Sequence, residues 1–166
     1  VGIRHLVYPQ PLPSLLAGGS SFYGPSRGQL EEIEVPALHA LGYTGNRVRV
    51  MMLDTGFRKD HDAFAEADLR EEYDFVFEDG DTRNEAEDDP GQHNHGTGCW
   101  AVRGGYDPGH LVGPAYGASF YLSKTEDIRS ETQAEEDNYV AALEWADAVG
   151  VRVTSASLTY TYFDDE

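Results

Sequence analysis

The sequence predicts an α/β fold with a mostly parallel central sheet, and three stretches support that prediction. Residues 47–53 (RVRVMML) alternate and then become fully apolar, which is typical of a central strand with both faces buried. Residues 132–150 have the spacing of a capped amphipathic helix, and residues 151–158 (VRVTSASL) follow it directly as a strand. Strands and helices in this alternation favour a parallel sheet with helices on its faces.

The chain before the first of these strands divides into an arm and a short helix. Residues 1–22 contain three prolines and the stretch AGGSS, which is the composition of a linker or an extended arm. The pattern of a folded domain starts at residue 23. Pro36 and Gly42 then bracket a short helix, because proline suits a first helical turn and glycine often follows a last one.

The middle of the chain adds two more predicted strands around an acidic loop. Residues 71–77 (EEYDFVF) and 117–124 (GASFYLSK) have strand composition, and residues 78–89 form a polar loop with seven acids. In the helix that follows, Thr132 and Glu135 fit a capping box. The face that we expect this helix to bury consists of Tyr139, Val140, Leu143, Ala146 and Val149.

The charge balance and the distribution of apolar residues argue against two classes of partner. The 12 Lys and Arg residues against 30 Asp and Glu residues give a net charge of −18, which repels phosphate backbones. No stretch approaches the roughly 18 consecutive apolar residues that a membrane helix needs, and the opening residues are too polar for a signal peptide. We therefore expect no nucleic acid and no membrane as a partner.

Asp54 and His95 are the candidate catalytic pair. Asp54 directly follows the strand at 47–53, so it should lie at the carboxyl end of a buried strand, where functional groups of open parallel sheets gather. His95 opens the stretch HGTG, whose small residues suit a tight entry into a helix. A buried carboxylate that accepts a hydrogen bond from an imidazole fixes its tautomer and stabilises the imidazolium formed when the other nitrogen takes a proton.

These motifs resemble those of the subtilisin-like serine proteases, the subtilases or peptidase family S8. RVRVMMLDTGF and QHNHGTG are similar to the aspartate and histidine signatures of that family, and the similarity covers about residues 23–160. The resemblance implies a three-layer subtilisin-like fold, here incomplete because the chain would be the N-terminal half. Residues 1–22 would then be a linker or a propeptide remnant, and residues 23–166 the N-terminal portion of the peptidase domain.

The resemblance also implies a serine-type endopeptidase that hydrolyses protein or peptide substrates with an Asp–His–Ser triad. Asp54 would orient the histidine, and His95 would be the general base. Residues 124–132 would border the cleft in which a peptide adds as a strand. The pocket beside the scissile bond would be bordered by Ser157, Leu158 and Thr159. The family further implies a secreted or extracytoplasmic location.

The chain departs from the family pattern where the nucleophile should be. No G-T-S segment follows the last strand, and the stretches GGS, GPS and GAS all precede the position where that segment should lie. The asparagine of the oxyanion hole belongs to the same absent part. We therefore expect the isolated chain to be inactive and to need the missing C-terminal half of the domain as its partner.

Two metal hypotheses and one cysteine remain open. His93, His95 and Asp54 could instead form a two-histidine, one-carboxylate metal set in a noncatalytic half-domain. Cys99 could be a nucleophile, although a lone cysteine is more often a small packing residue. The peptidase chemistry requires no cofactor, but a structural Ca²⁺ could bind the acidic loop. Its candidate ligands are Asp79, Asp81 and Asp88, with Glu87 and Asp89 as further possibilities.

Overall fold

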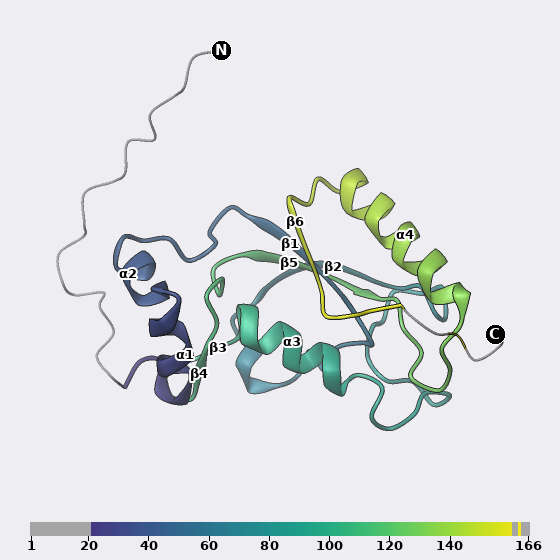
Figure 1. Ribbon diagram of the computed structural model, residues 1–166, viewed down its shortest axis with the longest axis horizontal. Helices are drawn as coiled ribbons and strands as arrows, with labels where there is room; N and C mark the ends of the chain where they lie inside the picture. Colours follow the sequence, from purple (N-terminus) through teal and green to yellow (C-terminus); the bar gives the residue numbers. More distant parts are fainter. Residues whose placement is uncertain (1–20, 161–162, 164–166) are drawn as a thin grey trace, which may run out of the picture.

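The computed structural model describes residues 21–160 and 163, and its centre is a four-stranded sheet (Figure 1). The strands lie in the order β2-β5-β1-β6, and every neighbouring pair is parallel, as the sequence predicts. Their bounds are β1 Arg49–Asp54, β2 Asp68–Asp74, β5 Ser119–Lys124 and β6 Val153–Ala156.

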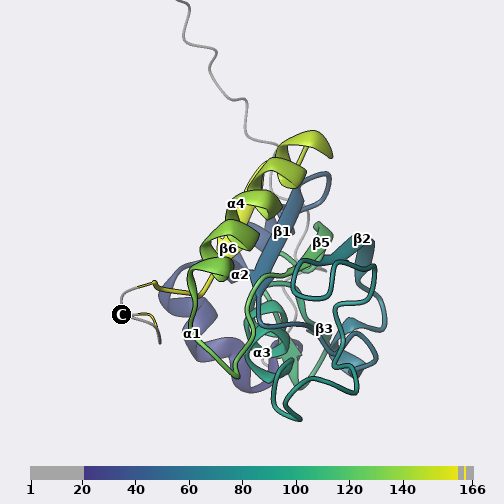
Figure 2. The same ribbon diagram turned by 90° about the vertical axis from the view of Figure 1, so that its right-hand side faces the viewer.

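Helices cover both faces of the sheet and give the molecule three layers. Helix α4 lies on one face and α3 on the other, which is visible in Figures 1 and 2. The helices and short 3-10 turns are η1 Gly24–Ser26, α1 Arg27–Glu32, α2 Val35–Ala40, η2 Asp62–Phe64, α3 Asn94–Gly104 and α4 Gln133–Ala148. A small antiparallel hairpin, β3 Tyr106–Asp107 and β4 Leu111–Val112, was not foreseen from the sequence.

Residues 50–53 of strand β1 are all apolar because each face of the strand packs against a different layer. Val50 and Met52 belong to the core cluster on the side of α3, whereas Met51 and Leu53 belong to the cluster on the side of α4. This alternation is the two-residue period of a strand. Trp100 of α3 fills the first cluster and lies fully buried.

Helix α4 has the predicted capping box at Thr132 and Glu135, but it is rotated relative to the predicted face. The face that packs on the sheet is centred on Ala142 and Ala146, which are buried. Val140 is 55% exposed and Leu143 is 37% exposed, so including them in the buried face was wrong. Two alanines one turn apart let the helix approach the sheet more closely than the larger side chains would.

All four predicted strands have different bounds in the structure, since residues 117–124 are observed as Ser119–Lys124 and residues 151–158 as Val153–Ala156, and backbone conformation explains the changed ends of the other two. The strand predicted at 71–77 ends at Asp74, because its Oδ1 accepts hydrogen bonds from the backbone N–H groups of Val76 and Phe77 and turns the chain. The strand predicted at 47–53 begins at Arg49, because Arg47 has a φ of 67° and cannot continue an extended strand.

The short helix predicted around Pro36 is present as α2, and it is anchored by a buried histidine. The His39 ring lies within hydrogen-bond distance of the Tyr23 hydroxyl at Nδ1 and of the Pro114 carbonyl at Nε2, each at 3.0 Å. The carbonyl can only accept, so Nε2 carries the proton and Nδ1 accepts from Tyr23. The arm predicted at 1–22 lies almost wholly outside the described residues. Within residues 21–160, no helix is long and apolar enough to cross a membrane.

Candidate active site

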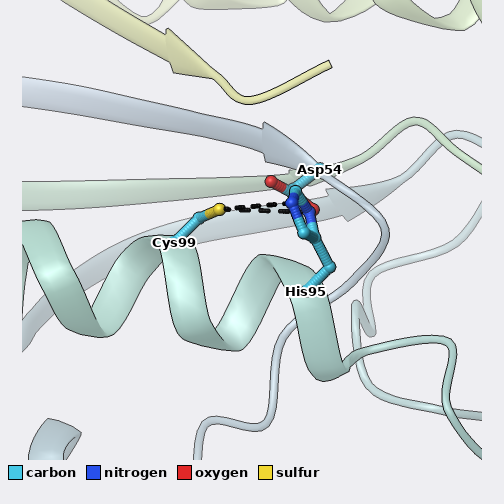
Figure 3. Close-up of side chains that lie close together, drawn as sticks. All are labelled: Asp54, His95 and Cys99. Carbon is cyan, nitrogen blue, oxygen red and sulfur yellow. Dashed lines mark hydrogen bonds and ion pairs between the residues drawn. The ribbon is translucent and has the colours of Figure 1, made fainter. Parts of the chain in front are cut away.

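Asp54 and His95 meet at the carboxyl edge of the sheet (Figure 3). Asp54 is the last residue of β1, and His95 lies in the first turn of α3. The distance from His95 Nδ1 to Asp54 Oδ1 is 2.6 Å. The Asp54 side chain is completely buried, whereas the His95 side chain is 53% exposed. The predicted contact is therefore present, with the carboxylate in the protein interior and the imidazole reachable from solvent.

The hydrogen bonds of Asp54 determine the tautomer of His95. Asp54 Oδ1 also accepts bonds from the Thr55 backbone N–H at 2.8 Å and the Thr55 hydroxyl at 3.3 Å. A carboxylate can only accept, so the proton on neutral His95 is at Nδ1 and the lone pair is at Nε2. This arrangement leaves Nε2 able to accept a proton from a group that approaches from solvent.

Small residues in both motifs allow β1 and α3 to come this close. A Cβ atom on Gly96 would lie 2.3 Å from the carbonyl oxygen of Gly56 and 3.0 Å from Cβ of Asp54. Gly56 itself has a φ of 125°, a conformation that side chains rarely adopt. Thr97 fixes the helix entry, because its hydroxyl donates to the His93 carbonyl at 2.6 Å and accepts from the Arg58 backbone N–H at 2.8 Å. These contacts explain why glycine and threonine occur at these positions of the DTG and HGT motifs.

Gln92 is a site residue that the sequence analysis missed. Its side chain is fully buried, and Nε2 donates to the carbonyl oxygens of Thr55 at 2.7 Å and Glu126 at 2.5 Å. Its Oε1 accepts from the Ile128 backbone N–H at 2.9 Å. Gln92 thus ties the end of β1 to the segment after β5. Its position three residues before His95 is the only signal that could have drawn attention to it.

An open cavity of about 570 Å³ lies beside the Asp–His pair. The segment after β5 forms one wall and the segment after β6 forms the other, so the structure brings together two stretches that the sequence analysis placed at a cleft. Thr55, next to Asp54, also lines it. The lining residues are Thr55, Glu126, Asp127, Ile128, Arg129, Ser130, Glu131, Glu135, Ser157, Leu158 and Thr159.

Glu126 gives this cavity an unusual acid. The residue is 7% exposed, and its Oε1 accepts hydrogen bonds from the Tyr160 hydroxyl at 2.5 Å and the Thr125 hydroxyl at 2.9 Å. Burial raises the pKa of Glu126 to about 7, against the smaller opposing effect of the two hydroxyls. Burial and the bond to Glu126 likewise raise the pKa of Tyr160. The Glu126 carboxyl in the cavity wall can therefore gain or lose a proton near neutral pH.

The acidic loop places the predicted calcium ligands in different surroundings. Asp81 is bound by Arg83 and Lys59, and these contacts lower its pKa well below the usual range. Asp88 accepts a hydrogen bond from the ammonium of Lys124 at 2.8 Å. Asp79 lies instead with Asp74 and Glu85, whose carboxylate oxygens are all within 4.8 Å of one another. Within the described part of the chain, Asp79, Asp81 and Asp88 do not converge on one point, and calcium binding stays a prediction.

Lys124 occupies the centre of that acidic region. Its side chain is completely buried, and Nζ lies 2.8 Å from Asp74 Oδ2 and 2.8 Å from Asp88 Oδ2. Burial by itself would lower the pKa of Lys124, but the bonds to the two carboxylates together raise it above its usual value. A protein cation thus already neutralises two of the buried acids.

The histidine pair of the metal hypothesis is separated in the structure. His93 Nδ1 faces the backbone N–H of Asn84 at 3.4 Å, and burial lowers its pKa. Its place beside Asp54 and His95 is taken by Cys99, whose Sγ lies 3.7 Å from His95 Nε2 and 3.9 Å from Nδ1. Cys99 also packs, half-buried, against the core cluster around Trp100, as expected for a small apolar side chain.

Comparison with known proteins gives one family and several solved structures. Residues 45–165 match the family model described as the subtilase family. Comparison with curated protein sequences finds no match.

The solved structures share the fold at low identity. The MycP3 protease from the type VII (ESX-3) secretion system has 19% identity and a TM-score of 0.66, over 95% of this chain and 42% of that one. Fervidolysin from Fervidobacterium pennivorans, a keratinolytic enzyme, has 17% identity and a TM-score of 0.59, over 92% and 22%. The Aeromonas sobria serine protease, solved in complex with its chaperone, has 22% identity and a TM-score of 0.59, over 75% of this chain and 20% of that one. The chain thus spans less than half the length of each protease.

Proposed function

The chain belongs to the subtilase family, and on that premise we propose that it is the part of a serine endopeptidase domain that supplies the aspartate and the histidine of an Asp–His–Ser triad. The observation that carries this proposal is the 2.6 Å contact between buried Asp54 and half-exposed His95. The serine would come from a part of the protein outside these 166 residues. This is in keeping with the small fraction of each similar protease that the chain spans.

In the proposed reaction, His95 acts as general base and then as general acid. As the serine oxygen attacks the carbonyl carbon of the scissile bond, Nε2 of His95 takes the hydroxyl proton. The imidazolium that forms donates from Nδ1 to Asp54, which stays ionised. When the tetrahedral intermediate collapses, Nε2 gives its proton to the leaving amine and an acyl-enzyme remains. Water then repeats the sequence and releases the acid product.

The cavity beside the pair is the proposed binding site for the substrate chain. Its walls come from residues 126–131 and 157–159, which lie after the carboxyl ends of β5 and β6. A peptide in extended conformation would run between them and form backbone hydrogen bonds, which tolerate many side chains. Ser157, Leu158 and Thr159 would then contact the residues before the scissile bond.

The rest of the domain is the proposed partner of the open side of the sheet. Among the described strands, β6 pairs only with β1, so its other edge has free backbone groups. Val153 on that strand is 48% exposed, and a cavity of about 360 Å³ beside it is lined partly by Val50, Phe120 and Ala156. Apolar surface next to an unpaired edge supports the addition of further strands and helices there.

The experiment uses the protein that contains this chain together with the rest of its peptidase domain. Hydrolysis of a peptide substrate should fall by about 10⁴-fold or more in Asp54→Ala and in His95→Ala, whereas the control His93→Ala should keep most of its activity. The 166-residue chain alone should hydrolyse nothing. Full activity in both variants would overturn the proposal.

Two further proposals concern the location of the protein and the binding of calcium. We propose that the protein acts outside the cytoplasm, as the family resemblance implies, and that the loop at 78–89 binds a structural Ca²⁺ near Asp79. The support for calcium is the close approach of the Asp79 and Glu85 carboxylates in this loop, beside Asp74, which already has Lys124 as its partner. A melting temperature that is the same in Ca²⁺ and in EDTA would contradict it, and recovery of the protein only from the cytoplasmic fraction of its host would contradict the location.

A further inference from the structure

The cavity beside the Asp–His pair has an excess of acidic residues in its lining. The acids are Glu126, Asp127, Glu131 and Glu135, and the one basic residue is Arg129. The guanidinium of Arg129 is already bound to both oxygens of Asp127, at 2.7 and 2.5 Å, and to the Glu87 carbonyl at 2.5 Å. It therefore compensates only one of the four acids, and the wall along which we propose that the substrate chain runs is negatively charged.

Glu126 differs from its acidic neighbour Glu135 in having an oxygen without a donor. Oε1 of Glu126 accepts hydrogen bonds from two hydroxyl groups, but Oε2 accepts none from the described residues. Glu135 uses both oxygens, because Oε1 accepts from the Asp127 backbone N–H at 3.0 Å and Oε2 from that of Thr132 at 3.2 Å. Glu126 is more than nine-tenths buried, yet it lines the cavity, so Oε2 is the oxygen that a ligand in the cavity can reach.

A positive charge is what the buried carboxylate lacks. Burial raises the pKa of Glu126 to about 7, and the carboxylates of Glu135 and Glu131 raise it further. The groups that oppose this effect are the hydroxyls of Tyr160 and Thr125, which carry no charge. Within the part of the chain that the structure describes, no lysine or arginine forms an ion pair with Glu126. An ionised carboxyl group in these surroundings gains most from a ligand that brings a cation.

The cavity also suits the apolar part of a long cationic side chain. Ile128 lies on one wall and Leu158 on the other, and both offer contact to the methylene groups of a lysine or an arginine. The hydrogen bond from the Tyr160 hydroxyl to Glu126 joins the segment after β6 to the segment after β5. It fixes the carboxyl group where the two walls meet.

We propose that the protein selects peptides that have a lysine or an arginine before the scissile bond, and that Glu126 binds the cationic group of that side chain. This inference rests on the proposed function, which places the peptide between the two walls. Oε2 would accept a hydrogen bond from the ammonium or guanidinium group, while Oε1 keeps its bond to Tyr160. The net charge of −18 adds a longer-range attraction for cationic peptides.

The selection should depend on pH, because only the ionised form of Glu126 attracts a cation. Glu126 changes from mainly protonated to mainly ionised between about pH 6 and about pH 8. The groups that face it are Glu131, Glu135 and Tyr160, and the ion pair of Asp127 with Arg129 lies beside it. Tyr160 keeps its proton in this range, since burial and Glu126 raise its pKa above the usual value. Preference for a cationic peptide should therefore be stronger at the higher pH.

The test measures peptide binding to the protein that contains this chain together with the rest of its peptidase domain. The variant His95→Ala is used, because it should not hydrolyse the peptide and lacks the titration of the histidine. Two N-acetylated, fluorescently labelled peptides differ only in one residue, which is lysine in one and the uncharged norleucine in the other. We expect fluorescence anisotropy to show at least about 10-fold tighter binding of the lysine peptide at about pH 8, and a smaller ratio at about pH 6.

Glu126→Gln on the same background keeps the shape of the side chain and removes its charge, so the ratio should fall to about one. Glu144→Gln is the matched control, because it removes an equal charge from an exposed position on α4 and should leave the ratio unchanged. Circular dichroism establishes that each variant is folded. Equal affinity for the two peptides before Glu126 is altered, or binding of neither, would overturn the proposal, as would a ratio that survives Glu126→Gln. This readout needs no hydrolysis, so its failure differs from that of the proposed function.

Discussion

Two charged clusters lie at the same edge of the sheet, and they differ in the partners of their carboxylates. Asp54 of β1 is opposite Lys124 of β5, and Lys124 is opposite Asp74 of β2. Lys124 binds Asp74 and Asp88 with all three side chains buried, which closes that cluster to solvent. Asp54 is equally buried, but its partner His95 is half exposed, which leaves that cluster open.

This difference separates a structural role from a chemical one. The buried ammonium stays charged and joins two strands to the acidic loop, so its proton is not available for reactions. An imidazole can both accept and donate a proton, and the exposure of His95 lets other groups reach it. In the proposed function, a buried carboxylate at a strand end serves catalysis only where its partner is an imidazole that other groups can reach.

The largest effect should come from removing the buried cation of the closed cluster. Lys124→Met leaves Asp74 and Asp88 buried without a cation, and we expect a loss of about 3–5 kcal/mol of unfolding free energy. Lys59, the only other lysine, pairs with Glu72 and Asp81 nearer the surface. Lys59→Met should cost about 1 kcal/mol. Urea denaturation measures both, and equal costs would show that the cluster around Lys124 is not special.

The next effect is a pH dependence from the cavity wall. The pKa of Glu126 is about 7 in the folded chain and 4.5 in an ordinary carboxyl group, so its contribution to stability is full below about pH 4.5 and is lost as pH rises through about 7. The loss should be about 3 kcal/mol. Urea unfolding at about pH 5 and about pH 8 measures this difference in unfolding free energy. The difference should disappear in Glu126→Gln, whereas it should remain in the exposed control Glu144→Gln. Identical pH dependence in both variants would contradict the assignment.

A smaller effect should follow from separating the two motifs of the open cluster. In Gly96→Ala the new methyl group would meet the backbone oxygen of Gly56, and we expect a loss of about 1–3 kcal/mol. A Cβ at Gly98 meets nothing within 4 Å, so Gly98→Ala should stabilise α3 by up to about 1 kcal/mol. Thermal unfolding measures the melting temperature of both variants. A change of the same sign in both would contradict the close approach of β1 and α3.

The smallest effect should come from removing the exposed base itself. His95→Ala deletes a half-exposed ring, and water can then reach Asp54, so we expect a cost of about 1 kcal/mol or less. The same urea titration measures it. A cost equal to that of Lys124→Met would mean that His95 supports the fold in the way that the closed cluster does.

The sequence predicted what depends on local pattern. The apolar run before Asp54 indicated a central strand, and the capping residues Thr132 and Glu135 marked the start of α4 correctly. The HGTG stretch indicated a helix entry next to Asp54, and the contact of Asp54 with His95 is present.

What could not be predicted depends on how the elements pack. The buried face of α4 is set by the shape of the sheet beneath it, so Val140 and Leu143 are exposed despite helical spacing. Gln92 and Lys124 are polar residues whose burial is possible only because partners from distant segments satisfy them. The contact of Cys99 with His95 was within reach of the sequence, since i and i+4 share a helix face.

The most direct test of the open cluster is the tautomer of His95, measured by ¹⁵N NMR of the imidazole nitrogens in the 166-residue chain at alkaline pH. We predict a protonated Nδ1 and an unprotonated Nε2, and a loss of this preference in Asp54→Asn, whose amide can donate to Nδ1. A protonated Nε2 in the unaltered chain would contradict the assignment of His95 as a base oriented by Asp54.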